Sequence, residues 1–573
     1  MTSIKSKLQV AMVLAVTVIV YAAIVIVGMR GSLNGDFDQY LVPGKYAAPE
    51  NIAAHGFSNR VFYEKSAGWD GQFHYYHSDD PLLLKDTVEH IDMPAYRTQR
   101  VGIPAITYVL SRLTGQEWVS PKFYFTVTVG LLLIAAYMLA TFLISRGYSA
   151  WYALVWTVGG STLYTVAFGF IDGSADALII ISLILYANKK INYYLAIISL
   201  AVLSKESYAI IPIALGFSQF AYHTALFLYS RDKFKFIIAI KSISTHTIPV
   251  IILIIWLFYL YIHLNTTDFV PKSGPGVMGA PFVGILTYII AGLNGDTLSR
   301  LFDMRQKFPP YQLSFGVFIF LLLLLSTLAI NISRMIRSRR VIANNPIKSG
   351  VMISSMALSA AYICMGPVQV WEPVGFVKAS SLVVVLFLLS SVINEKKISL
   401  IVIIIAISLC AYSFEIITNK TSKAKFNVEY DAIQWVESEP MCLKSANASI
   451  DLISLNPAYP DTILNRLIMP NRYIATVKIK NKSDYPLSPF KGKGTTNAGY
   501  QWFSNDASTL MFDGGRVPLP RTLLNGESEE VSFLVNPPTK SGSYTLRLTL
   551  VQEGCSWLYN INPAIKHDLK MEM

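Results

Sequence analysis

The sequence contains few charged residues. Only 15% of its 573 residues are Asp, Glu, Lys or Arg, whereas 53% are apolar and the mean hydropathy is positive. This composition excludes an ordinary soluble enzyme and indicates a membrane protein. The formal net charge of +12 does not indicate nucleic acid as a partner, because the basic residues form no stripe interleaved with stacking aromatic residues.

Cysteine is also scarce, since the chain has four. Cys364 and Cys410 fall inside apolar runs, where they act most simply as small apolar residues. Cys442 and Cys555 lie in the polar C-terminal part, where a disulfide could persist if that part is external. Sequence alone does not distinguish a bridge between them from two reduced thiols.

Long apolar runs predict about eleven membrane-spanning helices, since each needs roughly 20 mostly apolar residues. The candidates lie at 9–28, 121–145, 150–169, 174–188, 191–204, 208–229, 246–264, 312–333, 350–366, 376–393 and 398–417. The first run is longer than a signal-peptide core and lacks a cleavage pattern, so we interpret it as an uncleaved anchor. Two shorter runs, at 101–113 and 281–293, have the length of interfacial or re-entrant helices.

The distribution of Lys and Arg predicts the orientation of these spans. Short loops rich in Lys and Arg stay on the cytoplasmic side of a membrane. If the N-terminus is cytoplasmic, the basic segments fall on that side, near residues 5, 146, 190, 235, 337 and 397. The opposite short loops carry only Lys205. The long loops at 29–120 and 265–311, and the chain after residue 418, are then expected outside.

The C-terminal part, residues 419–573, has a different composition from the membrane domain at 1–418. Apolar residues alternate at period two in 473–480, 530–535 and 543–551, which predicts an antiparallel β-sandwich. Aromatic residues here could form a platform for sugar stacking, although at period two they more often lie in a core. We assign Trp557 to the core and leave both interpretations open for Trp502.

Ionisable residues gather in the first long loop, around the stretch GWDGQFHYY at 68–76. The aromatic neighbours of Asp70 would raise its pKa by desolvation, and a cation such as Arg97 would hold it ionised. A carboxylate balanced in this way suits proton abstraction from a hydroxyl. The alternative is structural: Asp70 could cap a short helix or close an Asp-Gly turn. Asp36 would then be the next candidate base.

Other polar residues have a structural alternative as well. His74 and His77, with Asp79 or Asp80, could offer metal ligands, but no His-Glu-x-x-His motif is present and we expect solvated or hydrogen-bonded histidines. Asp172 and Asp176 lie at the predicted mouth of a span. They could contact sugar hydroxyls or a divalent ion, and a helix cap at Asp172 is the simpler account.

Several short motifs resemble those of one known family. They are Trp69-Asp70-Gly71-Gln72 with Tyr75-Tyr76, Asp80-Pro81, the stretch IDMPAYRTQR at 91–100, and Lys205-Glu206-Ser207. Together they resemble a bacterial family of integral-membrane glycosyltransferases with the GT-C fold, and the Trp-Asp start is also similar to the GPI mannosyltransferases. The segments at 499–502, 513–520, 524–527 and 550–557 resemble a β-sandwich module appended to several bacterial polysaccharide-assembly enzymes.

The resemblance implies a GT-C-like membrane domain that transfers a sugar from a polyprenyl-phosphate donor to a glycan, lipid or protein acceptor. Transfer would occur on the external, periplasmic face of a bacterial inner membrane and invert the anomeric centre. The base would be an acidic residue of the first loop, Asp70 or Asp36. The leaving phosphate needs cations, which we expect to be Arg97, Arg100, Lys205 and Lys378. Substrate contacts are expected from Trp69, Gln72, Tyr75, Tyr96, Glu206 and Glu372. No cofactor is certain, and a divalent cation is an option.

Alternatives to this interpretation stay open. Arg97 and Arg100 could anchor an interfacial helix by snorkelling, and Lys205 with Glu206 could mark the membrane boundary. The chain could also be a lipid-linked glycan transporter or flippase, or a non-catalytic glycan-binding membrane protein. A transporter should carry charged residues in mid-helix and similarity between its halves. We favour a transferase because the predicted spans are nearly free of charge.

Overall fold

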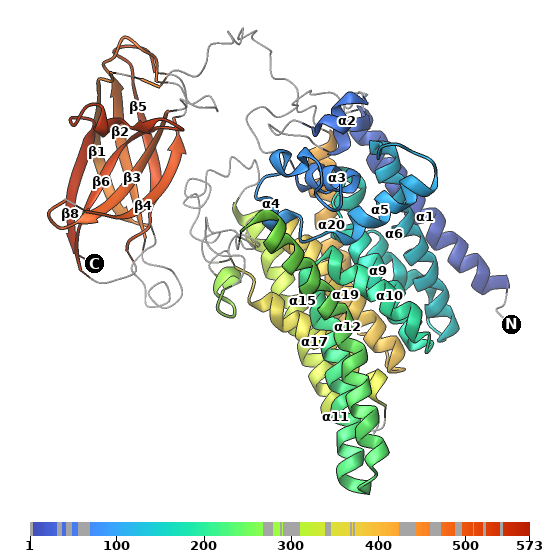
Figure 1. Cartoon of the computed structure of the whole chain (residues 1–573). Helices are drawn as coiled ribbons and strands as arrows, with labels where there is room; N and C mark the ends of the chain where they lie inside the picture. Colours follow the sequence, from blue (N-terminus) through green and yellow to red (C-terminus); the bar gives the residue numbers. More distant parts are fainter. Residues whose placement is uncertain are drawn as a thin grey trace. The chain divides into compact units, whose positions relative to one another are not determined.

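The computed structural model describes residues 4–30, 37–41, 48–55, 69–266, 279–286, 289, 310–337, 345–366, 370, 373–422, 442–443, 445–458, 472–487, 496–507, 509–519, 523–538 and 542–572. The chain divides into two compact units, which are described separately. The first holds the long apolar helices up to residue 422, and the second holds the β-strands from residue 448 onward (Figure 1).

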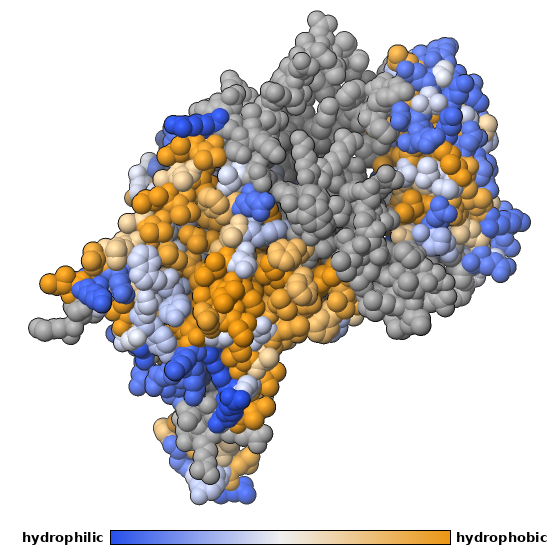
Figure 2. Space-filling model, turned by 180° about the vertical axis from the view of Figure 1, so that it is seen from behind, coloured by the Kyte–Doolittle hydropathy of each residue, from blue (hydrophilic) through white to orange (hydrophobic). Residues whose placement is uncertain are grey.

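Seven helices in the described part of the chain are long and apolar enough to cross a bilayer. They are α1 (Ile4–Arg30), α6 (Pro121–Ser145), α11 (Ile210–Ser230) with the preceding 3-10 turn η4 (Glu206–Ala209), α12 (Lys233–Leu264), α15 (Pro310–Arg337), α19 (Pro373–Ile393) and α20 (Leu400–Ser422). Figure 2 shows apolar residues over much of the outer surface of this unit. On α12, for example, Ile255 and Phe258 are 62% and 61% exposed. An apolar exterior is suited to lipid, so the protein is associated with a bilayer.

The remaining predicted spans form shorter or interrupted helices, so the structure supports fewer than the expected number of crossings. The run at 150–169 breaks into η3 (Ala150–Ala153), α7 (Leu154–Thr157) and α8 (Gly160–Phe168). The other three runs form α9 (Asp172–Ala187), α10 (Ile191–Ser204) and α17 (Pro346–Ile363). Every residue of α8 is buried, and α9 is buried over nearly its whole length. Their hydrophobicity therefore reflects burial among other helices as much as contact with lipid.

Short helices cover one end of the bundle (Figure 1). They are α2 (Glu50–Ala54), α3 (Asp70–Asp79), η2 (Asp86–His90), α4 (Pro94–Arg97) and α5 (Gly102–Leu113), preceded by η1 (Phe37–Leu41). The helix expected at 101–113 is confirmed as α5. Of the similar segment at 281–293, only residues 281–286 and 289 are described, with a helical turn at 283–286.

Two acidic residues of this region stabilise the local backbone by hydrogen bonds. The Asp79 carboxylate accepts hydrogen bonds from the Val119 backbone (2.9 Å) and from Lys85 Nζ (3.2 Å). The Asp80 carboxylate accepts from the backbone N–H groups of Leu84 and Lys85, both at 2.9 Å. Both aspartates thus have structural roles, because they satisfy backbone donors that would otherwise lack partners.

The second unit consists of two antiparallel sheets. One sheet has the order β1 (Ala448–Pro457), β2 (Tyr473–Asn481) and β5 (Ser528–Val535). The other has the order β4 (Leu510–Pro518), β3 (Thr496–Ser504) and β6 (Ser543–Gln552), and β6 also pairs with β7 (Ser556–Trp557) and β8 (Lys566–Glu572). The three strands expected from period-two alternation are confirmed as β2, β5 and β6. A shared core of Val477, Tyr500, Phe533 and Leu546 gives a sandwich-like arrangement.

Cys442 and Cys555 form a disulfide in this unit, with Cα atoms 5.4 Å apart. Trp502 is fully buried in the core, and its indole N–H donates to the Asn536 carbonyl at 2.8 Å. Our assignment of Trp557 to the core is wrong. Its ring is partly exposed because it lies on the outer side of the sheet, beneath the Arg516 guanidinium at 5.0 Å.

Candidate functional site

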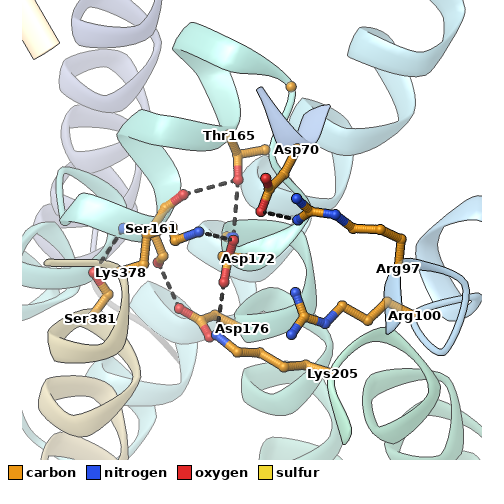
Figure 3. Close-up of polar contacts among 12 residues, drawn as sticks. Asp70, Arg97, Arg100, Ser161, Thr165, Asp172, Asp176, Lys205, Lys378 and Ser381 are labelled. Atoms are coloured by element: carbon orange, nitrogen blue, oxygen red, sulfur yellow. Dashed lines mark hydrogen bonds and ion pairs between the residues drawn. The ribbon is translucent and has the colours of Figure 1, made fainter. Parts of the chain in front are cut away.

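Eight ionised side chains form one cluster at the end of the membrane unit that α3, α4 and α5 cover. The members form three neighbouring ion-paired groups, which are Asp70 and Asp92 with Arg97, Arg100 with Glu206, and Lys205 and Lys378 with Asp172. We call this set the ionic cluster; Figure 3 shows most of its members. It joins the first loop to residues at the ends of α9, α10 and α19. The fold thus brings together all four cations that we predicted for the site.

Asp70 is the first residue of α3, where a carboxylate is favoured by the helix dipole. Its Oδ2 lies 2.7 Å from Nη1 of Arg97. The Nε and Nη2 atoms of Arg97 donate to the two oxygens of Asp92, at 2.8 and 3.3 Å. The residue at the N-cap of α3 is Trp69. Asp70 is therefore neither the helix cap nor part of the Asp-Gly turn that the structural alternative offered, because Asp70 and Gly71 lie within α3. The side chain of Asp70 is 31% exposed.

The electrostatic surroundings keep Asp70 ionised. Burial alone would raise the pKa of its carboxyl, but the charges of Arg97 and Lys378 overcome that effect and hold the pKa below its usual value. One turn further along α3, His74 is buried, and burial together with Arg100 lowers its pKa to about 3. The imidazole of His74 is therefore neutral at physiological pH.

A second ion pair joins Arg100 to Glu206, the first residue of η4. Nε and Nη2 of Arg100 donate to the two Glu206 oxygens at 3.1 and 3.0 Å, which is a forked contact. The Arg100 guanidinium also lies over the ring of Tyr96, 5.1 Å from its centroid. The Glu206 side chain is 33% exposed. Asp70 and Glu206 are thus the two most accessible carboxylates of the ionic cluster.

Asp172 binds two lysines at once. Its Oδ1 is 2.7 Å from Nζ of Lys205, which follows α10, and its Oδ2 is 3.1 Å from Nζ of Lys378 on α19. One turn further along α9, the Asp176 carboxylate accepts hydrogen bonds from Ser161 Oγ (2.6 Å) and from the Tyr208 hydroxyl. We had favoured a helix cap at Asp172, so this bridging role was missed. The available signal was an acidic residue at the start of an apolar run.

Two glycines allow the elements of the site to approach one another. A Cβ on Gly71, next to Asp70, would lie 2.1 Å from the Phe168 carbonyl oxygen at the end of α8. A Cβ on Gly160 would lie 2.1 Å from Cγ1 of Val377, the residue before Lys378. Only glycine fits these two contacts, so α8 lies directly against both α3 and α19.

The remaining predicted site residues have different environments. Trp69 stacks on Phe168 with ring centroids 4.6 Å apart, whereas Gln72 and Tyr75 are fully buried in α3. Tyr96 contacts Arg100, because Nη2 of Arg100 donates to its hydroxyl at 3.2 Å. Asp36 and Glu372 lie outside the described residues.

The histidines of α3 are packed in the protein interior. His77 bonds to the Pro81 carbonyl at 3.1 Å and stacks against Trp256 of α12. Among the described residues, no group of three or more His, Cys, Asp or Glu side chains is arranged to hold a metal ion.

No family model, curated protein or solved structure matches this chain. Function is therefore inferred from the geometry of the ionic cluster and from the chemistry that its side chains can perform.

Proposed function

We propose that this protein is a membrane glycosyltransferase of the GT-C type, which moves a sugar from a polyprenyl-phosphate donor to a cell-envelope glycan, lipid or protein acceptor. One observation carries the proposal. A partly exposed carboxylate, Asp70, pairs with Arg97 in a cluster that also contains Arg100, Lys205 and Lys378, at one end of a bundle of apolar helices. Proton abstraction and stabilisation of a leaving phosphate need this combination.

In the proposed reaction, Asp70 accepts the proton of an acceptor hydroxyl. The acceptor oxygen attacks the anomeric carbon, and the bond from that carbon to the phosphate oxygen breaks with its electron pair going to the phosphate. The nearby arginines and lysines stabilise the developing negative charge. A single carboxylate base fits an inverting displacement, because retention through a covalent intermediate normally needs two carboxylates.

The ion pair with Arg97 makes Asp70 a weak base in the empty site, since a low pKa means low basicity. When the donor binds, we expect the Arg97 guanidinium to interact with the donor phosphate as well, so that its interaction with the Asp70 carboxylate weakens. Asp70 would then become more basic in the complex than in the free protein. Asp36 is the second candidate base.

The proposed topology has about eleven crossings, a cytoplasmic N-terminus and the β unit outside, in the bacterial inner membrane. The segment formed by η3, α7 and α8, together with α9, α10 and α17, would complete the crossings. Two observations support this topology. The basic segments fall on the cytoplasmic side that it assigns, and Cys442 and Cys555 form a disulfide in the β unit, which it places outside. Disulfides persist in oxidising compartments such as the periplasm.

The test is transfer by the purified full-length protein in nanodiscs, with a panel of labelled polyprenyl-phosphate hexoses and pentoses and an envelope extract as acceptor. Asp70→Asn should lower turnover by about 10²–10⁴-fold, which is the usual contribution of a general base. Glu89→Gln is the matched control, because Glu89 is an exposed acid of the same loop that lies outside the ionic cluster. Full turnover in Asp70→Asn would reject Asp70 as base. Absence of turnover with every donor would favour the transporter or glycan-binding alternatives.

A further inference from the structure

The bridge between Asp172 and two lysines is an unusual feature of the ionic cluster. Lys205 and Lys378 come from different elements, and each ammonium group contacts a different oxygen of one carboxylate. Figure 3 shows these side chains meeting at Asp172. All three are largely buried, with 18%, 14% and 10% of the Lys205, Lys378 and Asp172 side chains exposed. The contacts therefore have little solvent screening.

A phosphate group would present the same pattern of ligands to these lysines. Like a carboxylate, it carries oxygens on one centre that can each accept from a separate ammonium group. Asp172 therefore offers the two lysines an internal anion of the kind that the proposed donor would supply. The two ammonium groups and the one carboxylate together leave one net positive charge.

The reaction proposed above changes the charge of the bound phosphate. The donor is a phosphodiester with one negative charge. When its bond to the sugar breaks, the phosphate keeps the electron pair and becomes a monoester, which carries about −1.5 to −2 charges at pH 7. Two uncompensated lysines would hold this product more strongly than the donor, because Coulomb attraction grows with the product of the charges. The enzyme would then be slow to release its product.

We propose that Asp172 is an internal counter-anion that competes with the lipid phosphate for Lys205 and Lys378, and so limits retention of the polyprenyl phosphate product. This inference rests on the proposed function. The other cations of the cluster follow the same pattern, since Arg97 and Arg100 also have carboxylate partners. Asp172 differs in pairing with two cations at once, so loss of its charge would leave two cations without their counter-charge.

Binding of two lipids tests this role without knowledge of the sugar. The probes are a polyprenyl monophosphate and its methyl diester, which has the single charge of the donor but cannot transfer a sugar. Their dissociation constants are measured with the full-length protein in nanodiscs. Asp172→Asn should bind the monophosphate about tenfold more tightly than the wild type. It should tighten binding of the diester less, and Asp172→Glu should restore the wild-type ratio of the two constants.

Lys378→Gln provides an independent variant in case Asp172→Asn does not fold. In Lys378→Gln, Lys205 stays paired with Asp172, and this pair has no net charge. Binding of the monophosphate should therefore weaken more than binding of the diester. Glu89→Gln is the control and should change neither constant. The inference is overturned if Asp172→Asn binds the monophosphate no more tightly than the wild type, or if Lys378→Gln leaves the ratio unchanged. A wild-type protein that binds neither lipid would instead reject the proposed function.

Discussion

The properties of Asp70 depend on its partner Arg97. The guanidinium is fixed by two contacts to Asp92 and presents its third nitrogen to Asp70. Arg97 cannot be replaced by lysine without losing this arrangement, because an ammonium group is a point charge without a planar fork. Asp92 therefore acts on Asp70 through Arg97.

Replacement of Arg97 should change the pH dependence of the reaction. Asp70 acts as a base only when deprotonated, so kcat/KM should fall as the pH falls through the pKa of Asp70 in the free enzyme. The lowered pKa places this acid limb below the ordinary value for Asp, about 3.9. Arg97→Gln removes the largest favourable charge, so the limb should move to higher pH. The measurement is kcat/KM against pH for both proteins.

Arg112→Gln is the control for this experiment. It removes a positive charge from a residue that pairs with Asp79 at 3.5 Å, outside the ionic cluster. Its acid limb should coincide with that of the wild type. An unchanged limb in Arg97→Gln would mean that Asp70 is not the group that titrates.

Residue type and position predicted six of the eight members of the ionic cluster, and the two that were not assigned to it are the carboxylates Asp92 and Asp172. Asp70 and Arg97 belong to one polar loop, so an ion pair between them could be expected from the sequence. Asp172 meets Lys378 only because α8, α9 and α19 pack together, and no local pattern reports such packing. The burial of Gln72 and Tyr75 was missed for the same reason, since α3 packs on both faces.

At the scale of the elements, apolar length was a good guide to the long helices and a poor one to the inner helices. Helices such as α12 and α15 were predicted because they are apolar over more than a full crossing. The run at 150–169 was read as one span, but Gly159 and Ser161 allow a break there. The backbone N–H of Ser161 donates to Ser381 Oγ at 3.0 Å, which satisfies a donor at the start of α8.

The contact of α8 with α19 should be essential for the position of Lys378. Gly160→Ala places a methyl group 2.1 Å from Val377 Cγ1 and 2.7 Å from its carbonyl oxygen, so the two helices must separate. We expect a loss of stability of about 1–3 kcal/mol, the usual cost of overpacking, and weaker binding of polyprenyl monophosphate. Thermal unfolding and lipid binding of the purified protein measure the two effects.

Gly130→Ala is the matched control for this substitution. Gly130 lies within α6, and an added Cβ would meet no atom within 4 Å. Alanine should therefore be neutral or stabilise the helix by up to about 1 kcal/mol. Equal stability of the two variants would show that α8 and α19 tolerate greater separation than their contact indicates.

At the scale of the whole molecule, the chain joins two units that are stabilised by different means. The membrane unit buries polar side chains in pairs, such as Tyr194 with His246 at 2.9 Å, and exposes apolar ones. The β unit has an apolar core and a disulfide that closes a sequence separation of 113 residues. Composition revealed this division from the sequence, because the change from long apolar runs to period-two alternation is abrupt.

The disulfide should stabilise the β unit and have no effect on the stability of the membrane unit. Loops of this length gain roughly 2–5 kcal/mol from a native bridge, so the double variant Cys442→Ala and Cys555→Ala should lower the stability of the β unit by that amount. Limited proteolysis of the full-length protein would show cleavage within 445–572 at lower temperature, while the helices stay intact. Cys410→Ala is the control, because Cys410 is a reduced residue of α20. If the double variant resists protease as well as the wild type does, the sandwich core alone maintains the unit and the bridge adds little.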